Sequence, residues 1–259
     1  MTVSRPSIPQ PSRQGFLAGL WNSLGFWRFA GLSGAFAAML LAAGLGYVMR
    51  EANRQPVLIA VLMSEGNQAA AVVNAFADGR ADRKVQIGKI VADIAARVKH
   101  LDIAMVDDND RANVLVKMVR DRDLFSTIST FYGGERAKEI KTTLDPQCLS
   151  GFRKNEKFEI EHSDVILTVD NGDFVFLDCA YEELLQSLGP INDTATVPWT
   201  MFNDSVSMGY FDVYDQYLLN LLYDPRIKAG MTVQEVKDVM PAVLADVRTW
   251  VKQVNNLAD

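Results

Sequence analysis

The sequence predicts an α+β domain that a single N-terminal membrane helix holds outside the cytoplasm. Residues 29–49 contain no charged side chain. From residue 56 onward, apolar runs of strand length alternate with segments of helical period. The chain has 259 residues, of which 49% are hydrophobic, so the part after the membrane helix can bury a core of its own.

The uncharged segment is long enough to cross a membrane. At about 1.5 Å per residue, a helix over residues 29–49 spans roughly 30 Å, the thickness of a hydrocarbon layer. Trp21, Trp27 and Tyr47 lie near its ends, where amphipathic rings favour the membrane interface. The alternative is a cleaved signal peptide, but its apolar stretch is about 7 to 15 residues and precedes a small-x-small cleavage site.

Charge sets the expected orientation. Residues 1–28 carry three arginines and no acid, and short basic flanks stay in the cytoplasm. We therefore expect a cytoplasmic tail (1–28), a membrane helix (29–49), a stem with the first strands (50–84) and a domain outside the cytoplasm (85–259). Residues 15–27 either lie on the inner surface as an amphipathic segment or begin the span.

Small side chains recur at every fourth position of the expected membrane helix. Such a ridge lets a second helix approach closely. Its residues are Ala30, Gly34, Ala38, Ala42 and Gly46.

The composition excludes some classes of partner. A net charge of -6 argues against nucleic acid, and two histidines leave no room for a histidine-rich metal site. The expected partners are the membrane and a protein or peptide, with no cofactor.

The first half of the exported part is expected to form strands around one helix. Residues 56–63 are typical of a buried strand, whereas the alanine-rich residues 68–77 fit a strand or a helix. A short strand at 85–87 is followed by an amphipathic helix, and residues 101–106 and 113–119 form strands around a polar turn. The apolar side of that helix consists of Ile87, Ile90, Val91, Ile94, Val98 and Leu101.

The middle of the chain is mixed and polar. We expect a helix after Gly133 and Gly134, a charged loop at 152–162 and an apolar strand at 164–169. Asn171-Gly172 could close a hairpin with 174–177, but helical spacing in the following residues favours a helix.

That helix, at about 173–188, is the centre of the predicted domain. Asp173 can cap its start, and Gly189 with Pro190 ends it. Glu182, Glu183 and Gln186 lie opposite the apolar face and form either a solvated surface or the wall of a cleft. The apolar face comprises Phe174, Leu177, Tyr181, Leu184, Leu185 and Leu188.

The C-terminal part contains a long connection and two helices. Residues 190–210 form the connection, and a helix is expected at 211–223. Thr232 and Glu235 form a capping box at the start of the last helix, in which Pro241 is a kink or a fresh start.

The two cysteines, Cys148 and Cys179, form either a disulfide or a pair of buried thiols. In an exported domain the disulfide is favoured, and it would join the charged middle segment to the first turn of the central helix.

Several motifs together resemble a proteobacterial family of unknown function, the domain of unknown function 2927, from about Val85 to the C-terminus. They are Cys179-Ala-Tyr-Glu-Glu-Leu-Leu-Gln-Ser-Leu-Gly189, Asn192-Asp193, Met201-Phe-Asn-Asp204, Leu221-Leu-Tyr-Asp-Pro-Arg226 and Gly230-Met231.

The same series resembles a degenerate, matrixin-like zincin metallopeptidase. The resemblance implies a zincin-like fold with Glu182 and Gln186 at two metal-ligand positions, Glu183 at the general base and Asn192 or Asp193 at the third ligand. Met201 would be the methionine of the turn. Zinc peptidases need neutral imidazoles at the ligand positions, and an amide oxygen is a weak zinc ligand. The resemblance therefore implies a cleft without a metal or a catalytic residue.

Residues 26–80 also resemble the membrane and first exported part of anti-sigma-K regulators, although residues 1–28 are too short for a sigma-binding domain. The proteobacterial resemblance implies that the membrane helix lies in the bacterial inner membrane and the C-terminal domain in the periplasm. The leading hypothesis is a non-catalytic binding or scaffolding protein of the bacterial envelope. The alternatives are an envelope hydrolase with a non-standard site and a signalling tether.

Overall fold

The computed structural model describes residues 62–63, 67–75, 81–143, 146–203 and 205–258. The expected tail, membrane helix and small-residue ridge lie outside these residues. Among the described helices, none has the length and apolar character needed to cross a membrane.

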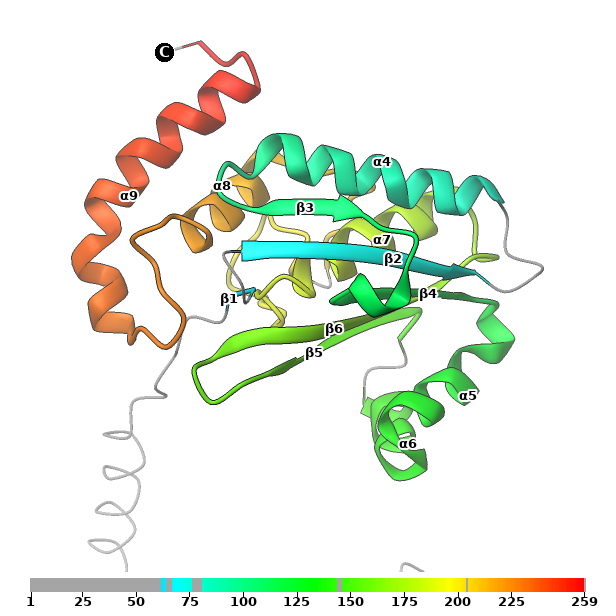
Figure 1. Ribbon diagram of the computed structural model, residues 1–259. Coiled ribbons are helices and arrows are strands. Elements are labelled where there is room, and N and C mark those ends of the chain that lie inside the picture. The colour runs from blue at the N-terminus through cyan, green and yellow to red at the C-terminus, as the bar shows by residue number, and fades with distance from the viewer. Residues whose placement is uncertain (1–61, 64–66, 76–80, 144–145, 204, 259) are drawn as a thin grey trace, which may run out of the picture. The chain divides into compact units, whose positions relative to one another are not determined.

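A mixed, six-stranded sheet lies at the centre of the described domain (Figure 1). Its strands run in the order β1-β6-β4-β2-β3, and β5 pairs with β6. The pairing of β5 is antiparallel and the other pairings are parallel. The strands are β1 (Leu62–Met63), β2 (Gln68–Ala75), β3 (Asp102–Met105), β4 (Val114–Val119), β5 (Cys148–Lys154) and β6 (Glu159–Thr168).

Four strand predictions have clear outcomes. The alanine-rich segment is a strand, β2, and it lies between β3 and β4 in the sheet. The strands expected at 101–106 and 113–119 are confirmed as β3 and β4. The strand expected at 85–87 is wrong, because these residues belong to α4 (Ala81–Arg97). The helical spacing that begins at Ile87 extends one and a half turns further back than the prediction placed it.

The charged loop expected at 152–162 is also wrong. These residues form most of a hairpin between β5 and β6. The Asn155 side chain closes its turn, because Oδ1 accepts hydrogen bonds from the backbone N–H groups of Lys157 and Glu159. Phe158 takes the left-handed conformation there, with φ 65°. Polar side chains on a strand that is only half buried concealed the alternation that would have predicted it.

Helices cover the sheet in two groups. The larger core joins α4, α7 (Asp173–Gln186), α8 (Val213–Leu222) and α9 (Val233–Val254) to the sheet. A smaller core, under α5 (Asp121–Tyr132) and α6 (Gly134–Thr143), includes Val119 of β4 and Ile166 of β6. In Figure 1, α4 and α7 lie on one side of the sheet and α5 with α6 on the other. The prediction found α6 and missed α5.

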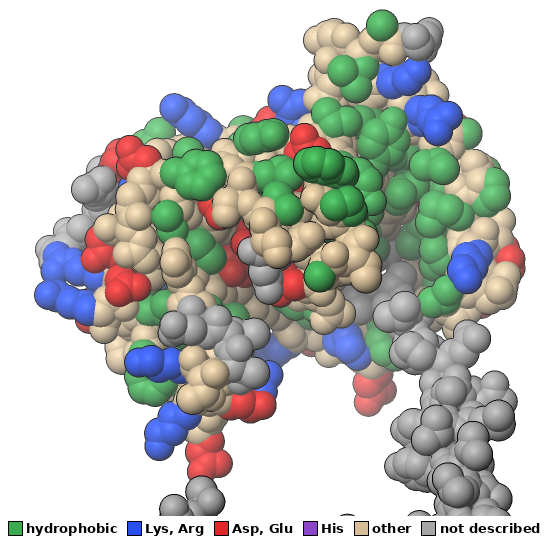
Figure 2. Space-filling view, turned by 180° about the vertical axis from the view of Figure 1, so that it is seen from behind, with side chains coloured by type: hydrophobic (Ala, Val, Ile, Leu, Met, Phe, Trp, Pro, Cys, Tyr) green, Lys and Arg blue, Asp and Glu red, His purple; other side chains and the backbone are tan. Residues whose placement is uncertain are grey.

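The C-terminal helices follow the sequence closely. The capping box of Thr232 and Glu235 is present at the start of α9, and the helix continues through Pro241. Seen from behind, the surface shows several hydrophobic patches separated by polar side chains (Figure 2).

Candidate functional site

The start of α7 is fixed by a buried arginine. Gly172, with φ 101°, is the N-cap residue and offers no side chain, so the expected cap by Asp173 is wrong. Asp173 instead accepts a hydrogen bond of 2.8 Å from Arg83 of α4. The Arg83 guanidinium lies 4.3 Å from the centre of the Phe176 ring. Phe174, expected on the apolar face, is 58% exposed, because the buried stripe of α7 runs through Phe176, Cys179 and Ala180 instead.

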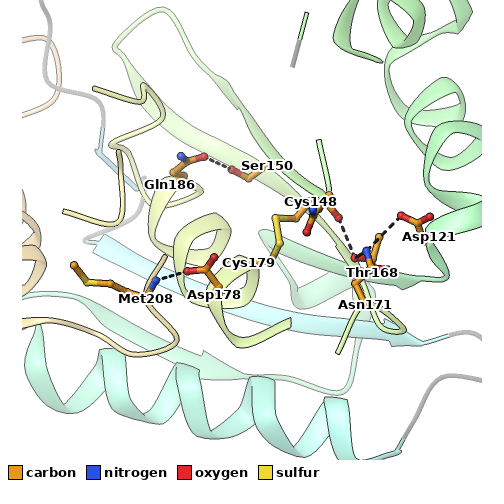
Figure 3. The surroundings of a disulfide bond; sticks show 10 residues. Asp121, Cys148, Ser150, Thr168, Asn171, Asp178, Cys179, Gln186 and Met208 are labelled. Carbon is orange, nitrogen blue, oxygen red and sulfur yellow. Dashed lines mark hydrogen bonds between the residues drawn. A yellow bond between two sulfur atoms is a disulfide. The ribbon is translucent and has the colours of Figure 1, made fainter. Parts of the chain in front are cut away.

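A disulfide joins α7 to β5. Cys148 and Cys179 are bonded, with their Cα atoms 5.9 Å apart (Figure 3). The predicted pairing is confirmed, although it links a strand to the middle of the helix and not a loop to its first turn. A disulfide of this kind indicates an extracytoplasmic domain.

Gln186 connects three segments of the chain near this disulfide. Its Oε1 accepts a hydrogen bond of 3.3 Å from the hydroxyl of Ser150 on β5 (Figure 3). Its Nε2 donates a hydrogen bond of 2.6 Å to Oδ1 of Asp193, in the connection after α7. Only 6% of Gln186 is exposed, whereas Ser150 is half-buried and Asp193 is exposed, so both bonds are partly buried.

Glu183 is buried beside this bridge. It is 6% exposed, and its Oε2 atom has no hydrogen-bond partner among the described residues. The pKa of Glu183 is raised to about 8: burial is the main cause, hydrogen bonds from Ser150 oppose the shift, and the negative charge of Asp193 adds to it. At neutral pH this carboxyl is therefore largely protonated and can donate a hydrogen bond.

Tyr132 lies against β5 at Gly151, the residue after Ser150. A Cβ atom on Gly151 would lie 2.7 Å from the Tyr132 hydroxyl oxygen, so the ring rests directly on the strand backbone. This hydroxyl is buried and has no partner in the part of the chain that the structure describes. Burial, followed by the charges of Asp164 and Glu183, raises the pKa of Tyr132 to about 12.

The connection after α7 is held rigidly by α8. Asp215 is fully buried and accepts hydrogen bonds from the Thr200 hydroxyl, at 2.5 Å, and from the Met201 N–H, at 3.1 Å. The Thr194 N–H donates to the Phe202 carbonyl and closes a loop over residues 194–202. Trp199, in this loop, is 71% exposed.

Asp178 holds the far end of the same connection. Its carboxylate accepts a hydrogen bond from the Met208 N–H (Figure 3). Burial raises the pKa of Asp178, and this bond opposes the shift.

The comparison with protein families decides which family this fold represents. A family model described as "Protein of unknown function (DUF2927)" matches residues 69–242. The chain belongs to this family. The match begins in β2, earlier than the expected start near Val85, and ends within α9. No curated protein matches the chain.

The DUF2927 domain brings together three of the six predicted site residues. Glu183, Gln186 and Asp193 form one cluster. Glu182 is partly exposed and Asn192 is exposed, while Met201 lies in the core. The idea of a fully solvated polar face is wrong for Glu183 and Gln186. Prediction missed Ser150 and Tyr132, because they lie on the strand and helix that it did not recognise.

The donor atoms of this DUF2927 cluster are carboxylate, amide and hydroxyl oxygens. No group of three or more His, Cys, Asp or Glu side chains within the described ranges could hold a metal ion. The Gln186 oxygen, which the zincin alignment treats as a ligand, already accepts the bond from Ser150.

Proposed function

We propose that this chain is a membrane-anchored binding or scaffolding protein of the bacterial envelope, whose degenerate zincin-like site binds an extended protein segment without cutting it. The observation that carries the proposal is the buried Glu183 carboxyl with its unpartnered Oε2, between Ser150 of β5 and Asp193 of the connection. Buried polar atoms are normally hydrogen-bonded, so an unpartnered one points to a ligand.

The surroundings of Glu183 suit an extended peptide. β5 pairs with β6 on one side, and no described strand pairs with its other edge. A free strand edge offers backbone groups to an added strand. The exposed Trp199 lies on a loop whose base is adjacent to Asp193, and tryptophan is enriched among binding hot spots.

Three positions of the zincin alignment support the proposed ancestry, since Glu183, Gln186 and Asp193 lie together as a peptidase cleft requires. The comparisons themselves add no support for zincin or anti-sigma ancestry. The absence of imidazole at the aligned ligand positions argues for binding over zinc-dependent hydrolysis.

A peptide library displayed on phage tests the proposal with the purified full-length chain. We expect selected peptides to bind the wild type and to lose about tenfold in affinity with Trp199→Ala, because truncating an aromatic anchor typically costs more than 1 kcal/mol. Phe125→Ala, which removes an exposed ring from α5, is the matched control and should leave affinity unchanged.

Two further variants locate the contact at Glu183. Glu183→Gln keeps a hydrogen-bond donor and should bind, whereas Glu183→Leu keeps the volume and should lose affinity. An intact disulfide and an unchanged circular dichroism spectrum would confirm that each variant folds. The proposal fails if no peptide is selected, or if Trp199→Ala and Glu183→Leu both bind as the wild type does.

A second candidate function is hydrolysis at a non-standard site. It is favoured by one observation, the hydrogen bonding of Ser150 to a carboxyl whose pKa is about 8, a value suited to general acid–base chemistry. Cleavage of a selected peptide that disappears in Glu183→Gln would support this alternative. Stoichiometric zinc that is lost in Glu182→Ala would contradict the binding proposal.

A further inference from the structure

A cavity of about 340 Å³ lies between the end of α4, the segment after α8 and one face of α9. It is separate from the Glu183 cluster, and its size falls in the range of ligand pockets, about 300 to 1,000 Å³. Its lining includes Lys99, His100, Arg226, Asp224 and Trp250.

The walls of this cavity are held in place by hydrogen bonds. The Arg97 carbonyl at the end of α4 accepts bonds of 2.9 Å from the Asn220 amide and from the Trp250 indole. The Lys99 backbone N–H donates to the Asn220 side chain at 2.9 Å. The helix-end carbonyl is therefore already bonded, and the cavity does not depend on a ligand for its shape.

The two acids of the cavity share one arginine. Asp224 is 4% exposed, and both its oxygens accept bonds of 2.7 Å from the Arg226 guanidinium. The same guanidinium donates to Asp246 at 2.7 Å. Arg226 therefore offsets one of the two negative charges, and Lys99 brings the charged side chains of the lining, apart from His100, to a net charge of zero.

Lys99 supplies the second positive charge of the lining. Its ammonium lies 5.7 Å from the centre of the Trp250 ring, and it makes no ion pair with a described residue. His100 is adjacent, and burial followed by the charge of Lys99 lowers its pKa, while Asp224 opposes the shift and Arg226 adds to it. The charge of Lys99 therefore affects the pKa of His100 more than the charge of Asp224 does.

We propose that this cavity binds a small anionic ligand, with its carboxylate or phosphate group between Lys99 and His100 and its apolar part against the Trp250 ring. Lys99 and His100 supply donors to the anion, and the indole offers an apolar wall of fixed orientation. The segment Asp224-Pro225-Arg226 after α8 then shapes a binding site as well as joining α8 to α9.

The chain contains only two histidines, which makes a direct test simple. The pKa of each imidazole in the full-length chain is measured by NMR with increasing inorganic phosphate, and separately with benzoate. Chloride at equal ionic strength is the reference. Binding next to His100 stabilises its cation, and a tenfold preference for the protonated form raises its pKa by about one unit. The pKa of His162, which contacts Asp164 outside this cavity, should not move.

Two lysine variants separate binding from general electrostatics. Lys99→Gln should raise the pKa of His100 without ligand and abolish the saturable shift, whereas Lys228→Gln, an exposed lysine outside the cavity lining, should do neither. A larger response to benzoate than to phosphate would show that the Trp250 wall contributes. Equal shifts of both histidines, or no shift of His100 with either anion, would overturn the proposal.

Discussion

At the scale of single residues, the contact between Tyr132 and Gly151 makes a specific prediction. Gly151→Ala places a Cβ atom 2.7 Å from the phenol oxygen, which forces the ring to move and costs about 1 to 3 kcal/mol of unfolding free energy. Tyr132→Phe removes that oxygen, and the next ring atoms lie at ordinary contact distances of 3.5 and 3.6 Å. In urea denaturation, the double variant Gly151→Ala/Tyr132→Phe should therefore be more stable than Gly151→Ala alone. If Gly151→Ala lowered the unfolding free energy equally in the wild type and in the Tyr132→Phe variant, this packing would be contradicted.

Glu183 makes a prediction about pH. Its pKa is about 8 in the folded chain against 4.5 ordinarily, so the folded state holds the proton more tightly. This contribution to stability is complete below pH 4.5 and is lost as pH rises through about 8, with a slope of up to about 1.4 kcal/mol per unit. Asp178 and Asp215 have pKa values raised by burial and act in the same direction.

Glu183→Gln should remove a large part of that slope when unfolding is measured by urea denaturation between pH 5 and 9. Glu156→Gln, in the exposed β5–β6 turn, is the matched control. A wild-type chain that becomes more stable as pH rises across this range would show that Glu183 is ionised in the fold.

At the scale of elements, the disulfide is the clearest test. The two cysteines are 31 residues apart, and closing such a loop stabilises the folded chain by about 3 to 4 kcal/mol in the chain-entropy model. Replacing Cys148 and Cys179 together by alanine should lower the unfolding free energy by this amount. The double variant should then be insensitive to reducing agent, whereas the wild type should lose stability when reduced. A reductant-insensitive wild type would contradict the bond.

A second prediction concerns the hydrogen bonds between α8 and the connection that follows α7. Thr200→Val keeps the side-chain shape but removes the bond to Asp215 and the acceptor for the Phe202 N–H. The buried Asp215 carboxylate keeps the Met201 N–H but loses its hydroxyl donor, and this loss should cost about 1 to 3 kcal/mol in urea denaturation. Thr196→Val, on the exposed part of the same loop, should cost far less. Equal losses would show that the anchor contributes little.

Prediction from sequence succeeded for elements whose hydrophobic pattern is complete. α4, α7 and α9 bury apolar stripes, β4 and the end of β6 bury apolar residues along their length, and β3 alternates around the buried Ile103. It failed for β5, whose side chains are partly exposed and polar, and for α5, which packs on a small separate core. The site could be predicted only in part for the same reason. Glu183 and Gln186 follow from helical spacing, and Asp193 is one of two residues that the zincin resemblance suggests. Ser150 follows only from strand pairing between distant segments.

At the scale of the whole molecule, the disulfide and the expected membrane helix give one joint prediction. Cells fractionated in the presence of a thiol-blocking reagent should hold the chain in the inner membrane, with both cysteines already oxidised and unreactive. Carbonate washing should not release it, because an apolar segment of 21 residues is long enough to span the bilayer. Release of the intact chain by carbonate, or free thiols in the cell, would contradict this arrangement.

The proposed peptide site is tested most directly by amide hydrogen exchange in the two outer strands of the sheet, with and without a selected peptide. β5 and β3 lie at opposite sides of the sheet, so each serves as the control for the other. If the chain binds an extended segment beside Glu183, exchange in β5 should slow, exchange in β3 should stay the same, and the peptide should be recovered intact. Unchanged exchange in β5 at saturating peptide, or recovery of a cleaved peptide, would contradict the account.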